Sequence, residues 1–273
     1  MIIKLIRHGE SDANIGKVDP SKFKDSAIPL SKNGIQQAIN TGDSIGKDFI
    51  KNASIYCSPY IRTRQTLQYI IEGTDINKKD ITVYEDPRLR EIDIGYDAPE
   101  EQLPLRKTHG WFYYRFKGGE SPADCFDRTS AYLESMMRES ERNPKDNILI
   151  VAHGMTIRCF VTRFLHLTVE QFEEMENPNN CEIITIDLKK HINSPVFSNG
   201  RWGMEGIRIR NAFERTTIME KILPLCKNRK EAEQWYYTEV IPSIGYTANE
   251  MIKLGRYESL LSYLERIEAD GFA

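Results

Sequence analysis

The apolar positions of the first 190 residues gather in short runs, separated by longer segments of mixed polarity. Several of these runs are apolar throughout, whereas a half-exposed strand would alternate apolar and polar residues, so they predict strands buried on both faces. The clearest is NILIVAHG, in which a continuous apolar run ends in turn residues. The predicted strands are residues 1–6, 53–58, 81–86, 147–154 and 181–188.

The segments between these runs carry helix signals. Ser31 is placed to cap a helix over residues 31–49, although Gly34 and Gly42 lower the helix propensity there. Two Ser-Pro pairs mark further helix starts, because serine caps a helix and proline suits its first position. These pairs lie at 58–59 and at 121–122, the second opening a helix to about residue 142. Shorter helices are predicted at 155–165 and 168–176, with an irregular segment over 96–118.

Strands that alternate with helices favour an α/β fold with a mostly parallel sheet sandwiched by helices. Residues 1–190 are expected to form this domain. The pattern then changes to a loop and two predicted helices, at 211–239 and 247–269. We interpret residues 191–273 as a C-terminal helical extension.

Composition and charge narrow the classes of function. The chain has 273 residues and a net charge of −3, which gives no general attraction to nucleic acid or to an anionic membrane. No apolar stretch approaches the roughly 20 residues that span a bilayer, and the opening run is too short for a signal peptide. The five cysteines are scattered without a C-x-x-C pair, which argues against a zinc site built on cysteine. A cytoplasmic location is therefore expected.

Reactive side chains follow four of the predicted strands. In a parallel sheet the carboxyl ends of the strands share one edge, where ligands collect. Residues from distant parts of the chain are therefore expected to converge there. They are Arg7 and His8 after the first strand, Arg62 in the helix after the second, Glu91 after the third, and His153 with Gly154 after the fourth.

Such a set suits phosphoryl transfer. A neutral imidazole is a competent nucleophile near neutral pH, and bidentate arginines stabilise the charge spread over the transferred phosphoryl group. We predict that Arg7 and Arg62 bind this group and that His153 donates to its remaining oxygen. Glu91 can protonate the leaving oxygen if its pKa is raised. Glycines beside both histidines would let the backbone approach the phosphate closely.

A metal site is the competing interpretation of the same residues. His8, His153 and Glu91 could in principle ligate a metal ion. Two arginines at the same edge of the sheet would repel a divalent cation. The sequence therefore predicts chemistry without a metal or other cofactor.

The chain resembles the histidine phosphatase superfamily, in its phosphoglycerate mutase-like branch. Six sequence blocks carry the resemblance, in the order in which the family has them, over residues 1 to about 165. They are RHGE at 7–10 with Asn14 following, LSKNGIQQA at 30–38, SPYIRTRQT at 58–66, LREIDIG at 89–95, GGES at 118–121 with Arg128, and VAHG at 151–154.

The resemblance implies that His8 becomes phosphorylated and that Arg7, Arg62 and His153 bind the phosphate. It also implies that Glu91 acts first as the acid and then as the base that activates water. Asn14 would add a phosphate contact, as would Gly154 at the second histidine. Glu10 is expected to position the pocket rather than to react.

The resemblance leaves three functions open. Similar mutases carry a Glu-Arg-x-Tyr-Gly run, whereas this chain has Glu91-Ile92-Asp93-Ile94-Gly95. The segment at 109–128 is more like that of the broad-specificity phosphatases, so hydrolysis of a phosphorylated small molecule is the leading prediction. The alternatives are phosphoglycerate mutase activity and a non-catalytic binding protein. No nucleic-acid or membrane partner is expected, and homo-oligomers are compatible with the sequence.

Overall fold

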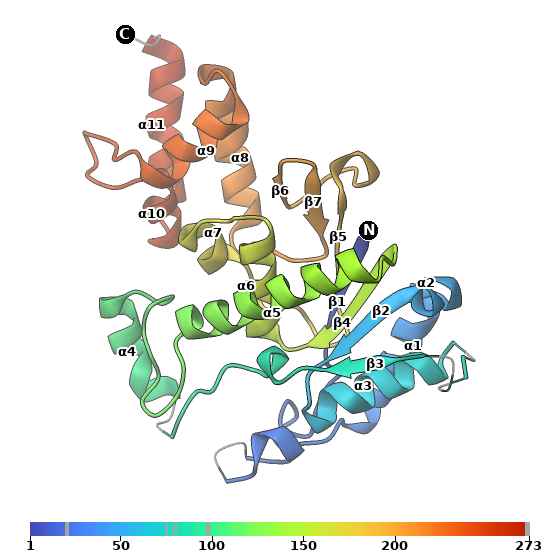
Figure 1. The fold of residues 1–273 in the computed structure, drawn as a ribbon. Coiled ribbons are helices and arrows are strands. Elements are labelled where there is room, and N and C mark those ends of the chain that lie inside the picture. The colour runs from blue at the N-terminus through green and yellow to red at the C-terminus, as the bar shows by residue number, and fades with distance from the viewer. Residues whose placement is uncertain (20–21, 75, 78, 80, 97–98, 271–273) are drawn as a thin grey trace. The chain divides into compact units, whose positions relative to one another are not determined.

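A seven-stranded sheet organises the first part of the chain (Figure 1). The structure is a computed structural model that describes residues 1–273 except 20–21, 75, 78, 80, 97–98 and 271–273. The chain divides into two compact units, Met1–Arg208 and Ile209–Ala273. The strands, in their order across the sheet, are β3 (Val83–Glu85), β2 (Ala53–Cys57), β4 (Asn147–Ala152), β1 (Ile2–Arg7), β5 (Ile183–Leu188), β7 (Trp202–Glu205) and β6 (Phe197–Asn199).

Half of the sheet is parallel. Strands β3, β2, β4 and β1 run in one direction, whereas β5 and the β6–β7 hairpin pair antiparallel beyond β1. The predicted α/β class is confirmed, with this antiparallel edge added. The hairpin also explains why the first unit ends at Arg208 rather than near residue 190, because it extends the same sheet.

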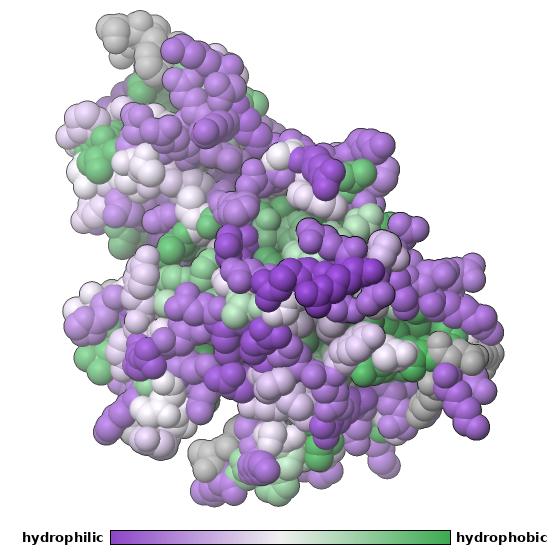
Figure 2. Space-filling view, viewed as in Figure 1, coloured by the Kyte–Doolittle hydropathy of each residue, from purple (hydrophilic) through white to green (hydrophobic). Residues whose placement is uncertain are grey.

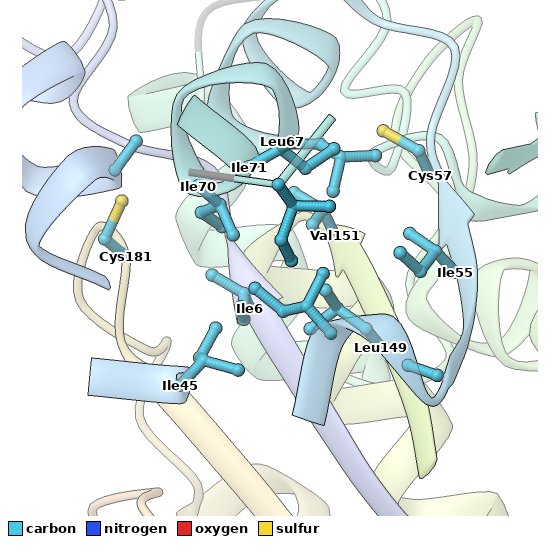
Figure 3. Close-up of a cluster of buried hydrophobic side chains, with 14 residues drawn as sticks. Ile6, Ile45, Ile55, Cys57, Leu67, Ile70, Ile71, Leu149, Val151 and Cys181 are labelled. Carbon is cyan, nitrogen blue, oxygen red and sulfur yellow. The ribbon is translucent and has the colours of Figure 1, made fainter. Parts of the chain in front are cut away.

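Helices cover both faces of the sheet (Figure 1). Isoleucine, leucine and valine side chains from β1, β2 and β4 pack against one helical layer and form a buried cluster (Figure 3). That layer consists of α1 (Lys32–Ile45), α2 (Lys47–Lys51) and α3 (Ile61–Glu72). The other layer contains α5 (Pro122–Arg142), α6 (Gly154–Phe164) and α7 (Val169–Glu174).

Two predicted helix starts have different outcomes. Ser121 caps α5 in a full capping box with Asp124, as predicted. The prediction for Ser58 is wrong, because α3 begins at Ile61 after Tyr60. The Ser58 hydroxyl is instead 2.8 Å from Nε2 of His153.

The predicted irregular segment at 96–118 contains a helix, α4 (Pro99–His109). Pro104 lies inside it and hides the helical pattern in the sequence. Tertiary contacts hold the helix in place, because the Arg106 guanidinium is stacked on the rings of Trp111 and Phe116, at 4.5 and 4.9 Å. Arg106 is thus buried, and not the exposed basic side chain that charge alone would suggest.

The second unit has a hydrophobic core of its own, built from residues 218–264. Each of its two predicted helices is divided in two. Pro224 lies in the break of the first, and Gly255, with a φ of 70°, lies in the break of the second. The resulting helices are α8 (Ala212–Ile222), α9 (Arg229–Thr238), α10 (Ala248–Lys253) and α11 (Tyr257–Asp270). None of the helices described in either unit has the length and apolar character needed to cross a bilayer.

Close packing explains a glycine that the sequence alone makes puzzling. A Cβ on Gly42 of α1 would lie 2.2 Å from the carbonyl oxygen of Ile70 on α3. Helix α1 therefore gives up helix propensity at this position so that the two backbones can approach.

We expect Gly42→Ala to lower stability, although alanine is the better helix former by about 1 kcal/mol. The backbone clash should destabilise the protein by about 1–3 kcal/mol, as overpacking usually does. The urea midpoint of unfolding, followed by circular dichroism, measures this effect. Ser44→Ala on the exposed face of the same helix is the control and should leave the midpoint nearly unchanged; an equal or higher midpoint for Gly42→Ala would refute the packing argument.

Candidate active site

The register of β1 on β4 brings the two predicted catalytic histidines together. Arg7 pairs with Ala152 at the ends of these parallel strands, so the next residues, His8 and His153, leave the sheet side by side. Their ring centroids are 5.2 Å apart, and both side chains are buried. The backbone N–H of His8 also donates to the Ala152 carbonyl, which extends the ladder to the site itself.

One ring nitrogen of His8 keeps a free lone pair. Its Nδ1 lies 2.8 Å from the Gly9 carbonyl oxygen, which can only accept a hydrogen bond. Nδ1 therefore carries the proton, and Nε2 keeps its lone pair. Within the described part of the chain Nε2 has no hydrogen-bond partner. Burial, and then the charges of Arg62 and Arg7, hold the pKa of His8 well below its usual range, so the ring stays neutral.

His153 is held by the residue that was expected to cap α3. Its Nε2 lies 2.8 Å from the Ser58 hydroxyl. Its Nδ1 is buried and has no partner among the described residues. Burial and the charge of Arg62 lower the pKa of His153 well below the usual value. The edge of this ring is thus available to a further polar group.

The Arg62 guanidinium is buried and anchored on one side only. It donates to the Asp25 carboxylate at 2.8 and 3.1 Å and to the Asp25 carbonyl at 2.7 Å. A guanidinium has five N–H groups, so two remain for another acceptor. The Tyr60 ring packs 4.9 Å from the guanidinium and 5.0 Å from the His153 ring, which joins the two residues.

Arg7 has the same one-sided anchoring. It donates from Nη1 to the Pro178 carbonyl at 2.7 Å. Its Nε is buried and unpartnered within the described residues. Burial lowers the pKa of Arg7, with Glu91 opposing and Arg62 adding to that shift. These mutual interactions place the two arginines and Glu91 in one site.

Burial and three guanidinium groups act on the carboxyl group of Glu91 in opposite directions. One of its oxygens accepts the backbone N–H of Ile92 at 3.0 Å. Burial raises the pKa of Glu91, although this hydrogen bond and the charges of Arg62, Arg7 and Arg128 lower it. The net upward direction is the one that a general acid requires.

Glu120 fixes the segment that carries Glu91. Its carboxylate accepts from Arg90 and, at 3.1 Å, from both Nε and Nη2 of Arg128. It also accepts the backbone N–H of Asp93 at 3.2 Å. On the other side, the Thr156 hydroxyl of α6 donates to the Arg90 carbonyl at 2.6 Å. The segment is therefore attached to α5 and α6 on both sides of Glu91.

The remaining predicted site residues lie around this centre. Asn14 is exposed, and its Oδ1 accepts from the backbone and hydroxyl of Ser11 and from Asn180. The Asn180 amide also donates to the His8 carbonyl at 3.0 Å, so it links Asn14 to the backbone of His8. Glu10 accepts from Ser31 and Asn33, and its role in positioning the pocket stays a prediction.

Both glycines of the site lie in close packing. A Cβ on Gly9 would lie 2.6 Å from the Gly34 carbonyl oxygen, and one on Gly154 would lie 3.1 Å from the Asn177 side chain. The structure thus gives these glycines a reason other than close approach to phosphate. Binding of the substrate by Gly154 stays a prediction.

Sequence reasoning missed several residues that hold the site. Three of them lie outside the sequence blocks that carry the resemblance: Asp25, Pro178 and Asn180. The fourth, Ser58, lies within such a block, but it was predicted to cap a helix and not to contact His153. The run NPNN at 177–180 was the available signal, since it is a turn-forming segment that directly precedes a strand. In the part of the chain that the structure describes, no three His, Cys, Asp or Glu side chains are grouped to hold a metal ion.

Fold and site together define an α/β protein with a buried histidine pair and two arginines at the carboxyl ends of its parallel strands. A family model described as histidine phosphatase superfamily (branch 1) matches residues 3–199. The chain therefore belongs to the histidine phosphatase superfamily, whose members include phosphatases and phosphotransferases.

Named relatives fall into both groups. The phosphoglycerate mutase-like protein AT74H of Arabidopsis thaliana is 38% identical over 208 residues, covering 68% of this chain and 73% of that protein. The broad-range acid phosphatase DET1 of Saccharomyces cerevisiae is 25% identical over 292 residues, covering 71% and 87%. A mycobacterial glucosyl-3-phosphoglycerate phosphatase, solved with vanadate, shares the fold with a TM-score of 0.57 at 23% identity, covering 77% of this chain and 98% of its own.

The lowered pKa values of the two buried histidines predict a loss of stability in mild acid. Below the unfolded value near 6.5, the unfolded state binds protons that the folded state does not. Each histidine can then remove up to about 1.4 kcal/mol per pH unit. Urea midpoints measured between pH 7 and 5 should fall more steeply for the natural protein than for His8→Gln. His109→Gln, on the exposed surface, should keep the full slope; equal slopes in all three proteins would contradict the buried neutral state.

Proposed function

We propose that this protein is a phosphatase that hydrolyses phosphomonoesters through a phosphohistidine intermediate on His8, without a metal ion. The observation that carries the proposal is the buried, neutral His8 ring, with its proton fixed on Nδ1 and its Nε2 lone pair unengaged. A structural histidine would be expected to use both nitrogens in hydrogen bonds.

The reaction takes two steps. In the first, His8 Nε2 attacks phosphorus in line, the bond to the ester oxygen breaks, and protonated Glu91 gives its proton to that oxygen. In the second, the Glu91 carboxylate takes a proton from water, the water oxygen attacks phosphorus, and the bond between phosphorus and His8 Nε2 breaks. Inorganic phosphate leaves, and His8 and Glu91 return to their starting protonation states.

The unused donors of the site account for binding of the phosphoryl group. Arg62 has two free N–H groups, and buried Nε of Arg7 and Nδ1 of His153 have no partner among the described residues. Three transferring oxygens would give each of them an acceptor, in a buried site where charge-assisted bonds are strong. Asn14 and Gly154 are the further contacts that we propose at its rim.

Hydrolysis is favoured over mutase chemistry by the residues next to Glu91. A bisphosphorylated glycerate needs cations in addition to those that hold the transferred group. Arg90, next to Glu91 in sequence, and Arg128 both pair with Glu120. Residues 92–95 supply no cation. Phosphoglycerate mutase activity remains the second candidate, because the Arabidopsis relative is named as mutase-like.

A non-catalytic binding protein is the third candidate, and the site argues against it. Such a protein would not need an unprotonated Nε2 beside a carboxyl group of raised pKa. The proposed substrate class is small phosphomonoesters, and the proposal does not extend to one particular compound. A cytoplasmic location, which the five free cysteines support, stays a prediction.

Removing the nucleophile should abolish turnover and the covalent intermediate. We expect His8→Ala to lower kcat for p-nitrophenyl phosphate by at least about 10³-fold, because no other group is placed to accept the phosphoryl group. Rapid quench with ³²P-labelled substrate should trap an acid-labile, alkali-stable adduct in the natural protein only. His109→Ala is the matched control. Full turnover by His8→Ala would disprove the mechanism, and isomerisation of phosphoglycerate faster than phosphate release would identify a mutase.

The loss of activity on removing the proposed general acid should depend on the leaving group of the substrate. Since Glu91 must be protonated for the first step, activity should fall as pH rises through its raised pKa. Glu91→Gln should lose about 10²–10⁴-fold in kcat/KM on an alkyl phosphate and lose this limb of the pH profile. The loss should be much smaller on p-nitrophenyl phosphate, whose leaving group needs no proton. Equal losses on both substrates would show that Glu91 does not protonate the leaving oxygen; Glu85→Gln is the control.

A further inference from the structure

A cavity lies in the first unit, at the other end of α6 from the proposed active site. It has a volume of about 670 Å³ and lies between α5, the end of α6 and the β6–β7 hairpin. Helix α6 starts beside His153 and runs for 11 residues, which is about 16 Å at 1.5 Å per residue. Figure 2 shows this face, with a strongly hydrophilic band over α5 and hydrophobic side chains between it and the hairpin. We call the cavity the α5–α6 groove.

The lining of the α5–α6 groove is positively charged in a protein whose net charge is −3. Arg138, Arg163 and Arg201 line it, with Glu134 as the acidic residue of the lining. The Glu134 carboxylate lies 4.0 Å from the Arg138 guanidinium. Among the residues described, Arg163 and Arg201 form no ion pair. Two guanidinium groups are therefore left without a counter-charge.

The walls of the groove are fixed in the folded protein. The Asn199 amide donates to the Leu165 carbonyl at 3.0 Å, which ties the hairpin to the end of α6. The rings of Phe164 and Trp202 meet edge to face at 5.4 Å. The Arg201 guanidinium is stacked 5.0 Å from the Trp202 ring, which orients its N–H groups. The arginines are thus presented on a firm, partly aromatic surface.

We propose that the α5–α6 groove binds a small molecule carrying two or more phosphate groups. Guanidinium groups match phosphate oxygens in geometry and charge, and three of them around one cavity suit a polyanion better than a single phosphate. The volume lies in the range of small-molecule pockets, about 300–1,000 Å³. The aromatic pair offers an apolar contact to a ligand that also carries a ring. This site is separate from the phosphoryl-transfer site and does not depend on the proposed function.

Calorimetric titration of the full-length protein tests the proposal. The probes are inorganic tripolyphosphate and ATP, and all proteins carry His8→Ala so that neither probe is turned over through that histidine. We expect two binding events, one at each site. Arg163→Ala with Arg201→Ala should weaken one event at least tenfold and keep the other. Arg62→Ala should weaken the other event only.

A matched pair controls for charge and folding. Arg229→Ala with Arg266→Ala removes two exposed arginines from the second unit and should leave both events unchanged. Thermal unfolding verifies that each variant is folded. Tighter binding of ATP than of tripolyphosphate would indicate a ligand with an aromatic ring, and equal binding a polyphosphate alone. The proposal would be overturned if the titration showed only one binding event and Arg62→Ala abolished it. It would also be overturned if the variant with Arg163→Ala and Arg201→Ala bound both probes as the parent protein does.

Discussion

The structure depends on the parallel ladder between β1 and β4. These strands carry His8 and His153 directly beyond their last paired residues, so their register sets the distance between the two rings. A slip of one residue would turn each following side chain to the opposite face of the sheet. Strand β1 is also paired on its other side with β5, which leaves it no freedom to shift. The position of the nucleophile is therefore a property of the sheet, not of a loop.

Burial then decides the protonation of the site. The two histidines are kept neutral because a charged ring would lose its hydration among buried arginines. The two arginines are each anchored from one side, Arg62 by Asp25 and Arg7 by the Pro178 carbonyl. The result is an excess of positive charge and of unused hydrogen-bond donors around His8, whose Nε2 has no hydrogen-bond partner among the described residues. Under the proposed function, a tetrahedral dianion would supply both the missing charge and the missing acceptors.

In the proposed function, the segment after Glu91 is the feature that favours hydrolysis over transfer to a second phosphate position. Glu120 draws Arg90 and Arg128 to itself and binds the backbone of Asp93. These arginines consequently hold the segment in place. If they were unpaired, their guanidinium groups could instead bind a second anionic group. A family scaffold can in this way keep its phosphoryl-transfer centre while changing the rim that selects substrates.

The sequence by itself determined the α/β class, the strand-end placement of Arg7, His8 and His153, and the superfamily. It could do so because a buried strand has a continuous apolar pattern and its first polar residue marks its end. It did not determine α4, where Pro104 obscures a helix held by Arg106 stacking, nor the division of the tail helices. Only the tertiary structure assigned Asp25, Ser58 and Asn180 to the site. Their contacts join segments far apart in the chain, and no local pattern records which distant partner a polar side chain will meet.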